Sequence, residues 1–206
     1  MIGVYDYTVL ATYLSLLLGL SGIYLSAQGD AMVATLCLML CGLLDAFDGR
    51  IARTKPNRTD VEKRFGIQID SLNDLVCFGV LPAAIGCALG CTKAWFLASM
   101  AFFVLCALIR LAYFNVLEEE RQSGTDAVRH HYLGLPVTSI SFLAPLVCIL
   151  NTYVGKLDLA VAYCLALLVF GVLFITPLRV RKPGLKGIIA LAVLGAAELV
   201  LLLLVQ

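Results

Sequence analysis

Seven apolar runs, each about 20 residues long, dominate this chain of 206 residues. They cover approximately residues 8–27, 31–49, 70–91, 94–117, 134–152, 157–177 and 186–205. A helix needs about 20 apolar residues to cross a bilayer, where only helices and closed barrels satisfy their backbone hydrogen bonds. Charged residues make up 14% of the chain, well below the roughly 25% of soluble domains. We therefore expect a single all-α, polytopic membrane domain over residues 1–206, with six core transmembrane helices at about 8–177 and a seventh, C-terminal one at about 186–205.

Lysine and arginine are distributed unequally between the links that join these runs. If every run crosses the membrane, thirteen of the fifteen lie on one side: Arg50, Arg53, Lys55, Arg58, Lys63, Arg64, Arg110, Arg121, Arg129, Arg179, Arg181, Lys182 and Lys186. The other two, Lys93 and Lys156, lie on the opposite side. Positive residues accumulate on the cytoplasmic side of membrane proteins. We expect a multi-pass protein of the cell membrane with its N-terminus in the cytoplasm and its C-terminus outside.

Four aspartates lie at the cytoplasmic ends of the second and third runs. Asp45 and Asp48 are i,i+3 neighbours, and Asp70 and Asp74 are i,i+4 neighbours, so each pair lies on one helix face. An ionisable residue in a membrane span is costly and is a functional candidate by default. Mg²⁺ and Mn²⁺ prefer oxygen ligands, so two facing pairs predict a site for one or two divalent cations. The alternative, helix caps and ion-pair partners, explains only one aspartate at each helix end.

These aspartates belong to a longer pattern, formed by Asp45, Asp48, Gly49, Ala52, Arg53, Gly66, Asp70 and Asp74. It resembles the signature of the CDP-alcohol phosphatidyltransferase family, D-x2-D-G-x2-A-R-x8-G-x3-D-x3-D, with every fixed letter present. The departure is the segment TKPNRTDVEKRF, which has twelve residues where the signature has eight. Because it combines Pro56 with six charges and has no apolar run, we expect this whole segment to be a surface connection at the membrane face.

The resemblance implies a role for each carboxylate. Asp45, Asp48, Asp70 and Asp74 would hold Mg²⁺ or Mn²⁺, in a two-metal site. Asp74, the last of the set, would also be the catalytic base that accepts the proton of the acceptor hydroxyl.

The same resemblance implies a nucleotide site beside the metal. Gly49 would let the nucleotide of CDP-diacylglycerol approach the backbone, and Arg53 would pair with phosphate. Counting forward from Arg53 places Thr59 where related enzymes have a hydroxyl that touches the nucleotide. Counting back from Gly66 selects Lys63 instead, and both assignments stay open.

Three further segments are similar to the serine-accepting branch of the family. They are DSLNDLVCFGVLP from Asp70, RLAYFNV from Arg110 (with Tyr113 in place of a second arginine) and YLGLP from Tyr132. The resemblance implies a homodimer, embedded in membrane lipids and without a nucleic-acid partner, that converts CDP-diacylglycerol and L-serine to phosphatidylserine and CMP. One alternative is the same chemistry with glycerol 3-phosphate or inositol phosphate as acceptor. Another is a cation transporter, which would carry its carboxylates near the bilayer midplane on discontinuous helices.

Arg110 and Asn115 are the candidates for the acceptor site. A guanidinium suits the serine carboxylate or a phosphate, but an arginine near a helix end also extends to the lipid headgroups. His130 and His131 lie in a polar link and are interpreted either as interfacial residues or as catalytic ones.

Eight cysteines lie in or beside the apolar runs, and none forms a CxxC pair. This distribution is typical of small packing residues and does not indicate a zinc site or a disulfide framework.

Overall fold

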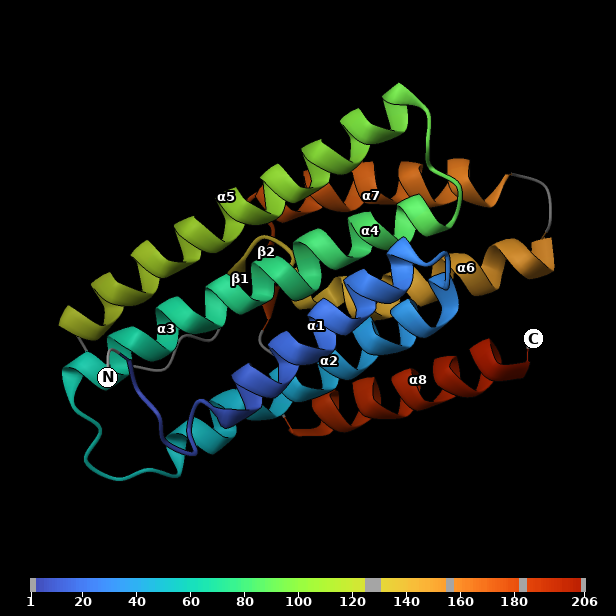
Figure 1. Ribbon diagram of the computed structural model, residues 1–206. Coiled ribbons are helices and arrows are strands. Elements are labelled where there is room, and N and C mark those ends of the chain that lie inside the picture. Colours follow the sequence, from blue (N-terminus) through green and yellow to red (C-terminus); the bar gives the residue numbers. More distant parts are fainter. Residues whose placement is uncertain (1–2, 125–130, 155–157, 182–184, 205–206) are drawn as a thin grey trace.

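The computed structural model describes residues 3–124, 131–154, 158–181 and 185–204. Figure 1 shows a bundle of long helices that run roughly along one axis. Its elements are α1 (Leu10–Ala27), α2 (Ala31–Arg53), α3 (Asp60–Asp74), η1 (Leu75–Val80), α4 (Leu81–Ala88), α5 (Ala94–Gly124), β1 (His131–Leu133), η2 (Val137–Ser139), α6 (Ile140–Val154), α7 (Leu159–Ile175), β2 (Arg179–Arg181) and α8 (Leu185–Leu204). The all-α class predicted for this chain is confirmed.

Four helical stretches are long and apolar enough to cross a membrane. They are Leu10–Ala27, Ala31–Ala52, Asp60–Ala88 and Ala94–Glu120. The last three expected spans form shorter apolar helices in the described residues, so the count of seven crossings stays a prediction. The two chain termini lie at opposite ends of the bundle, as an odd number of crossings requires (Figure 1).

The third helix begins ten residues earlier than its apolar run. The Thr59 hydroxyl accepts a hydrogen bond from the Glu62 amide at 3.2 Å, and the Glu62 carboxylate accepts one from the Thr59 amide at 2.8 Å. This reciprocal capping box satisfies two of the amides that a helix start leaves without partners. The expected twelve-residue surface connection was therefore wrong from Asp60 onwards, and the link between α2 and α3 is only residues 54–59.

A π-helical segment, η1, follows directly after Asp74. Pro82 has no N–H for the Phe78 carbonyl, and such a missing donor commonly widens the preceding turn. The chain nevertheless stays helical from Asp60 to Ala88. The wide turn thus adjoins the C-terminal carboxylate of the predicted metal site, a place where π-helical turns are common.

Gly42 allows α2 to approach α6 closely. A Cβ atom at this position would lie 2.7 Å from the Ser141 Cβ, which is closer than carbon atoms pack. Small residues at such crossings are typical of membrane helices. The contact sits one turn before Asp45 on α2, so it also sets the position of the first aspartate pair.

We expect Gly42→Ala to lower the stability of the folded protein by about 1–3 kcal/mol, the usual cost of overpacking. Because α2 must shift to make room, turnover should fall as well. Ser141→Gly removes the atoms that the new methyl group meets. The double variant should therefore recover most of the lost thermal stability in detergent, and a double variant no more stable than Gly42→Ala would contradict this packing.

Two short strands, which the hydropathy pattern did not predict, join the links before α6 and before α8. β1 pairs with β2 in antiparallel register, with His131 opposite Arg181 and Leu133 opposite Arg179. The chain then turns at Gly134, whose φ is +81° and whose amide donates to the Leu178 carbonyl at 2.8 Å. A Cβ at Gly134 would lie 2.6 Å from the Phe174 carbonyl oxygen, so this turn requires glycine.

Candidate metal centre

The fold brings the predicted carboxylates of α2 and α3 together. One oxygen atom each of Asp45, Asp70 and Asp74 lies within 4.8 Å of the other two. Asp48 lies within hydrogen-bonding reach of Asp70. The two pairs, 22 or more residues apart in the sequence, therefore form one cluster.

Two buried oxygen atoms of this cluster have no hydrogen-bond partner among the described residues. They are the Oδ1 atoms of Asp70 and Asp74. None of the ion pairs found in the described part of the chain includes any of the four aspartates. Burying carboxylates without a counter-charge is costly, whereas a divalent cation with oxygen ligands would offset their repulsion. The donor set therefore fits Mg²⁺ or Mn²⁺.

The capping interpretation of these aspartates was wrong. The helix caps with a side-chain hydrogen bond, in the part of the chain that is described, are Asp30, Thr59 and Asp158. Asp45 and Asp70 instead lie well inside α2 and α3.

Gly49 and Arg53 follow the first aspartate pair on α2. Gly49 is exposed, and no atom outside its own turn lies within 4 Å of the place a Cβ would take. Open space remains there for a ligand to approach the backbone. Arg53 ends α2, and its side chain lies outside the described ones.

Thr59 and Lys63, the two candidates for the nucleotide contact, both lie at the start of α3. The Thr59 hydroxyl oxygen is used in the capping box, although its hydrogen can still be donated. Lys63 pairs with Asp60 at 3.4 Å, and both side chains are exposed. The geometry of the described residues does not favour either assignment.

Arg58 is a cation of this region that the sequence analysis did not single out. Its Nη2 atom donates to the Glu62 carbonyl at 3.2 Å, and its buried Nε atom has no hydrogen-bond partner among the described residues. A Cβ at Gly66 would lie 2.8 Å from that Nη2. The glycine of the signature thus leaves room for a guanidinium beside the first turns of α3, which gives Gly66 a physical reason.

Arg110 lies inside the protein. Its side chain is buried, its guanidinium carbon lies 5.6 Å from the centre of the Phe114 ring, and its Nε reaches the turn at Gly134. The interpretation that this arginine extends to the lipid headgroups was therefore wrong, because the turn after β1 covers it. Its suggested contact with the acceptor stays a prediction.

Asn115 links α5 to α3. Its Oδ1 accepts a hydrogen bond from the Ser71 hydroxyl at 2.6 Å, and its amide group donates to the Gln68 side chain at 3.2 Å. Gln68 in turn donates to Glu119 at 2.9 Å. Because Ser71 is next to Asp70, this network holds the second aspartate pair against α5. A direct role of Asn115 in acceptor binding also stays a prediction.

The two histidines give no further evidence. His130 lies outside the described residues, and His131 is described only as part of the β1 backbone.

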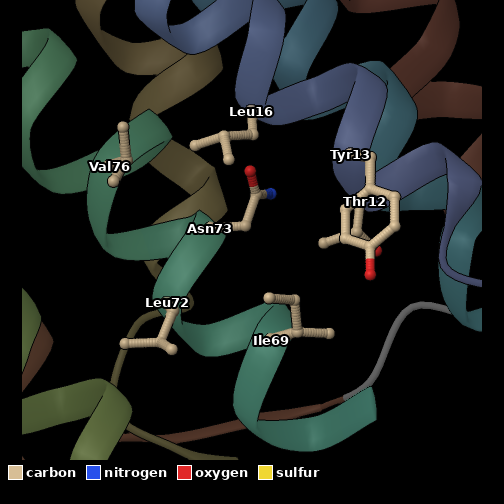
Figure 2. Close-up of a pocket in the computed structure, with 7 residues that line it drawn as sticks. All are labelled: Thr12, Tyr13, Leu16, Ile69, Leu72, Asn73 and Val76. Atoms are coloured by element: carbon tan, nitrogen blue, oxygen red, sulfur yellow. The ribbon is translucent and has the colours of Figure 1, made fainter. Parts of the chain in front are cut away.

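A shallow, mainly apolar pocket of about 170 Å³ lies between α1 and the helix that carries Asp70 and Asp74 (Figure 2). Its lining residues are Thr12, Tyr13, Leu16, Ile69, Leu72, Asn73 and Val76. None of the four aspartates lines it, although Ile69 and Asn73 are their sequence neighbours. The pocket therefore adjoins the cluster without being part of it.

One buried carboxyl group outside the aspartate cluster was not predicted from the sequence. Glu198 of α8 is 3% exposed, and neither of its oxygens has a hydrogen-bond partner among the described residues. It belongs to no group of three or more metal-ligating side chains in the described part of the chain. A single acidic residue within the last apolar run was the available sequence signal.

Lys55 fastens the N-terminal segment to the start of α3. Its ammonium group lies 2.6 Å from the Asp6 carboxylate and 2.7 Å from that of Glu62. The Lys55 contact, together with the Thr8 hydroxyl, lowers the pKa of Asp6 from 3.8 to about 2. Asp6, Lys55 and Glu62 thus form a network of ion pairs, here called the clasp. It ties the N-terminal segment and the α2–α3 link to the first turn of α3, near the candidate metal centre.

Lys55→Met is expected to lower the melting temperature at neutral pH, because both carboxylates lose their cation. The folded state lowers the pKa of Asp6, so its contribution is fully present above about pH 4 and is lost as the pH falls towards 2. The difference in melting temperature between wild type and variant should shrink over that range. Lys63→Met is the control, since its ion pair is exposed and contributes little. Equal effects of the two variants would contradict the clasp.

Comparison with known proteins agrees with this geometry. A family model described as CDP-alcohol phosphatidyltransferase matches residues 8–197. A CDP-diacylglycerol–serine O-phosphatidyltransferase of Saccharomyces cerevisiae is 36% identical over 139 residues, which are 62% of this chain and 49% of the yeast protein. One from Helicobacter pylori is 28% identical over 196 residues, 89% of this chain and 74% of that protein. An archaetidylserine synthase of Methanothermobacter thermautotrophicus is 32% identical over 140 residues, 66% of this chain and 57% of that protein.

The chain thus spans about half the length of the yeast relative and about three quarters of the Helicobacter one. The family model, by contrast, covers nearly all of this chain and includes the four clustered aspartates, Gly49, Arg53 and Gly66. This protein belongs to the CDP-alcohol phosphatidyltransferase family.

Proposed function

We propose that this protein transfers the phosphatidyl group of CDP-diacylglycerol to the hydroxyl of L-serine, giving phosphatidylserine and CMP. The observation that carries the proposal is the cluster of Asp45, Asp70 and Asp74 inside a family member, in which one buried oxygen each of Asp70 and Asp74 has no hydrogen-bond partner among the described residues. The names of the yeast and Helicobacter relatives support serine as the acceptor.

Asp45, Asp48, Asp70 and Asp74 would hold Mg²⁺ or Mn²⁺, as a two-metal site. When bound, such ions offset the charge of the pyrophosphate and of the departing CMP. The residues of the chain would position the metal ligands and bind the two substrates. Asn115 and Ser71 keep α3, and with it the second aspartate pair, in place against α5.

The nucleotide would lie over the end of α2. Gly49 leaves open space there, and Arg53 would pair with a phosphate oxygen, as a guanidinium does well. Arg58 joins these candidates, because its Nε needs a partner. Thr59 or Lys63 would supply one further contact. The apolar pocket that Ile69 and Asn73 help to line suits a substrate with acyl chains.

Asp74 would act as the general base. Its side chain is 7% exposed, and its Oδ1 has no hydrogen-bond partner in the described structure, so an acceptor for the serine proton is available there. A hydroxyl attacks phosphorus poorly until a positioned base takes its proton. Arg110 would bind the serine carboxylate through a charge-assisted hydrogen bond, and Asn115 would border the same site.

The proposed arrangement in the cell is a homodimer with seven crossings of the cell membrane and an active site that faces the cytoplasm. The α2–α3 link, with Lys55 and Arg58, supports this orientation through its positive charge.

The purified protein, supplied with CDP-diacylglycerol and Mn²⁺, tests the acceptor. We expect CMP release with L-serine and much slower release with glycerol 3-phosphate, inositol phosphate or no alcohol. The Asp48→Asn variant, in which we expect metal-dependent turnover to be lost, measures the background release of CMP. Faster CMP release with another alcohol would mean that this alcohol, and not serine, is the acceptor, while the phosphatidyl transfer itself would stand. No CMP release with any alcohol would reject both the acceptor and the transfer reaction.

A further inference from the structure

Two buried cysteines meet at the end of the bundle that lies opposite the aspartates. Cys91 belongs to the link between α4 and α5, and Cys164 lies in the second turn of α7. Their Sγ atoms are 3.0 Å apart. Cys91 is 2% exposed and Cys164 is fully buried. Figure 1 shows the α4–α5 link beside the start of α7, at the end away from the α2–α3 link.

The position of these thiols differs from that of the other cysteines nearby. Cys87 is exposed, and its thiol points to the Met100 sulfur at 3.9 Å. Cys164 donates directly to Cys91, while Cys91 donates to the Ala160 carbonyl at 3.4 Å. A disulfide has a sulfur–sulfur distance of about 2.05 Å, so closure requires these two atoms to approach by about 1 Å. Cys91 lies between α4 and α5 and follows Gly90, whose φ is +94°. Its amide donates to the Gly86 carbonyl of α4 at 3.0 Å, so Cys91 is attached to the end of α4 but is not part of a helix.

We propose that Cys91 and Cys164 are a modification site that closes to an intrachain disulfide. The oxidant would be a small disulfide of the glutathione class. The Cys91 thiolate attacks one sulfur of that molecule and releases the first thiol, and the Cys164 thiolate then attacks the Cys91 sulfur and releases the second. The two protein thiols lose two protons and two electrons, and the small disulfide is reduced to two thiols.

The place of the pair in the bundle favours oxidation. In the proposed topology this end lies outside the cytoplasm, where disulfides form and persist. The bond would tie the α4–α5 link to α7 and close a long loop, which restricts the unfolded chain and stabilises the folded one. Since the aspartates belong to α2 and α3 and lie away from this end of the bundle, turnover should not depend on the bond.

Burial affects the rate of this reaction. Desolvation and the neighbouring Cys164 raise the pKa of the Cys91 thiol well above its usual range, so little thiolate is present in the folded protein. Closure should therefore be fastest while the chain inserts and folds, and slow afterwards. An experiment on the folded protein must therefore show that a small thiol reagent reaches both Cys91 and Cys164 during the incubation.

The test uses the full-length protein in detergent with oxidised glutathione. The protein is first reduced and freed of reductant, and a parallel reduced sample with a small maleimide gives the incubation time at which Cys91 and Cys164 are labelled. After that time, free thiols are alkylated under denaturing conditions and peptides are mapped by mass spectrometry. We expect six free thiols of the eight, a Cys91–Cys164 peptide pair lighter by two hydrogen atoms, and a melting temperature that falls by several degrees on reduction.

Cys91→Ser should lose the linked peptide and the dependence of its melting temperature on reductant, with unchanged CMP release. Cys87→Ser, the neighbouring control, should keep both. Eight free thiols in the wild type at the labelling time, or a linkage through Cys87, would overturn the proposal. Neither result would bear on the phosphatidyl transfer, which is measured separately.

Discussion

Asp48→Asn should lower CMP release by about 100-fold or more, and Asp45→Ala and Asp70→Ala should do the same. Each change removes a proposed oxygen ligand from the aspartate cluster, in which one oxygen each of Asp45, Asp70 and Asp74 lies within 4.8 Å of the others. Loss of even an outer partner of a metal ligand costs about 10–100-fold in affinity or activity, and a direct ligand should cost more. Weaker binding of Mn²⁺, measured by titration calorimetry, should accompany the loss of turnover.

Asp30→Asn is the matched control for this series. Asp30 caps α2 at the opposite end of that helix, where its Oδ1 accepts from the Val33 amide at 3.0 Å. Asparagine caps helices about as well as aspartate, so this variant should keep its activity and its Mn²⁺ affinity. More than about a tenth of wild-type turnover in Asp45→Ala, Asp48→Asn or Asp70→Ala would count against the ligand assignment, because a lost ligand costs more than that.

Asp74→Asn should separate the role of a base from that of a ligand. Asparagine keeps the shape and polarity of the side chain but does not accept the serine proton. General-base catalysis typically contributes about 10² to 10⁴-fold, so turnover should fall by that amount, or further if Asp74 also holds a metal. The affinity for CDP-diacylglycerol should change far less than in Asp48→Asn, where a proposed metal ligand beside Asp70 is lost.

Metal titration distinguishes the two roles. If Asp74 is only a fourth ligand, then raised Mn²⁺ or Mg²⁺ should restore much of the activity of Asp74→Asn. If it is the base, saturating metal should leave the rate low, because the proton still has no acceptor. Substantial rescue would therefore reject Asp74 as the base while leaving it in the metal centre.

The helices and the aspartate cluster were predictable because their signals are local. Hydropathy located the apolar runs, and the i,i+3 and i,i+4 spacings placed each aspartate pair on one helix face. The two pairs were expected to face each other because they lie at the same ends of two neighbouring apolar runs. The start of α3 was also visible in principle, since Thr59 and Glu62 have the spacing of a capping box. The same segment also contains Pro56 and six charges, which are equally typical of a surface loop, so the capping spacing alone does not decide its structure.

Other features depend on contacts between distant segments. Arg110 is covered only because β1 and β2 pair and bring the turn at Gly134 onto α5. Two three-residue strands in a chain of long helices leave little hydropathy signal. The contact of Arg58 with Gly66 likewise depends on how the α2–α3 link folds back. Such features need the three-dimensional structure, because no periodic pattern encodes them.

Transfer from serine labelled with ¹⁸O in its hydroxyl group tests the proposed reaction most directly. The hydroxyl oxygen that loses its proton to Asp74 should become the bridging oxygen of the new phosphodiester. The account predicts phosphatidylserine that carries the label, an equal amount of unlabelled CMP, and the loss of both products in Asp48→Asn. Unlabelled phosphatidylserine, or CMP released at the same rate without serine, would contradict it.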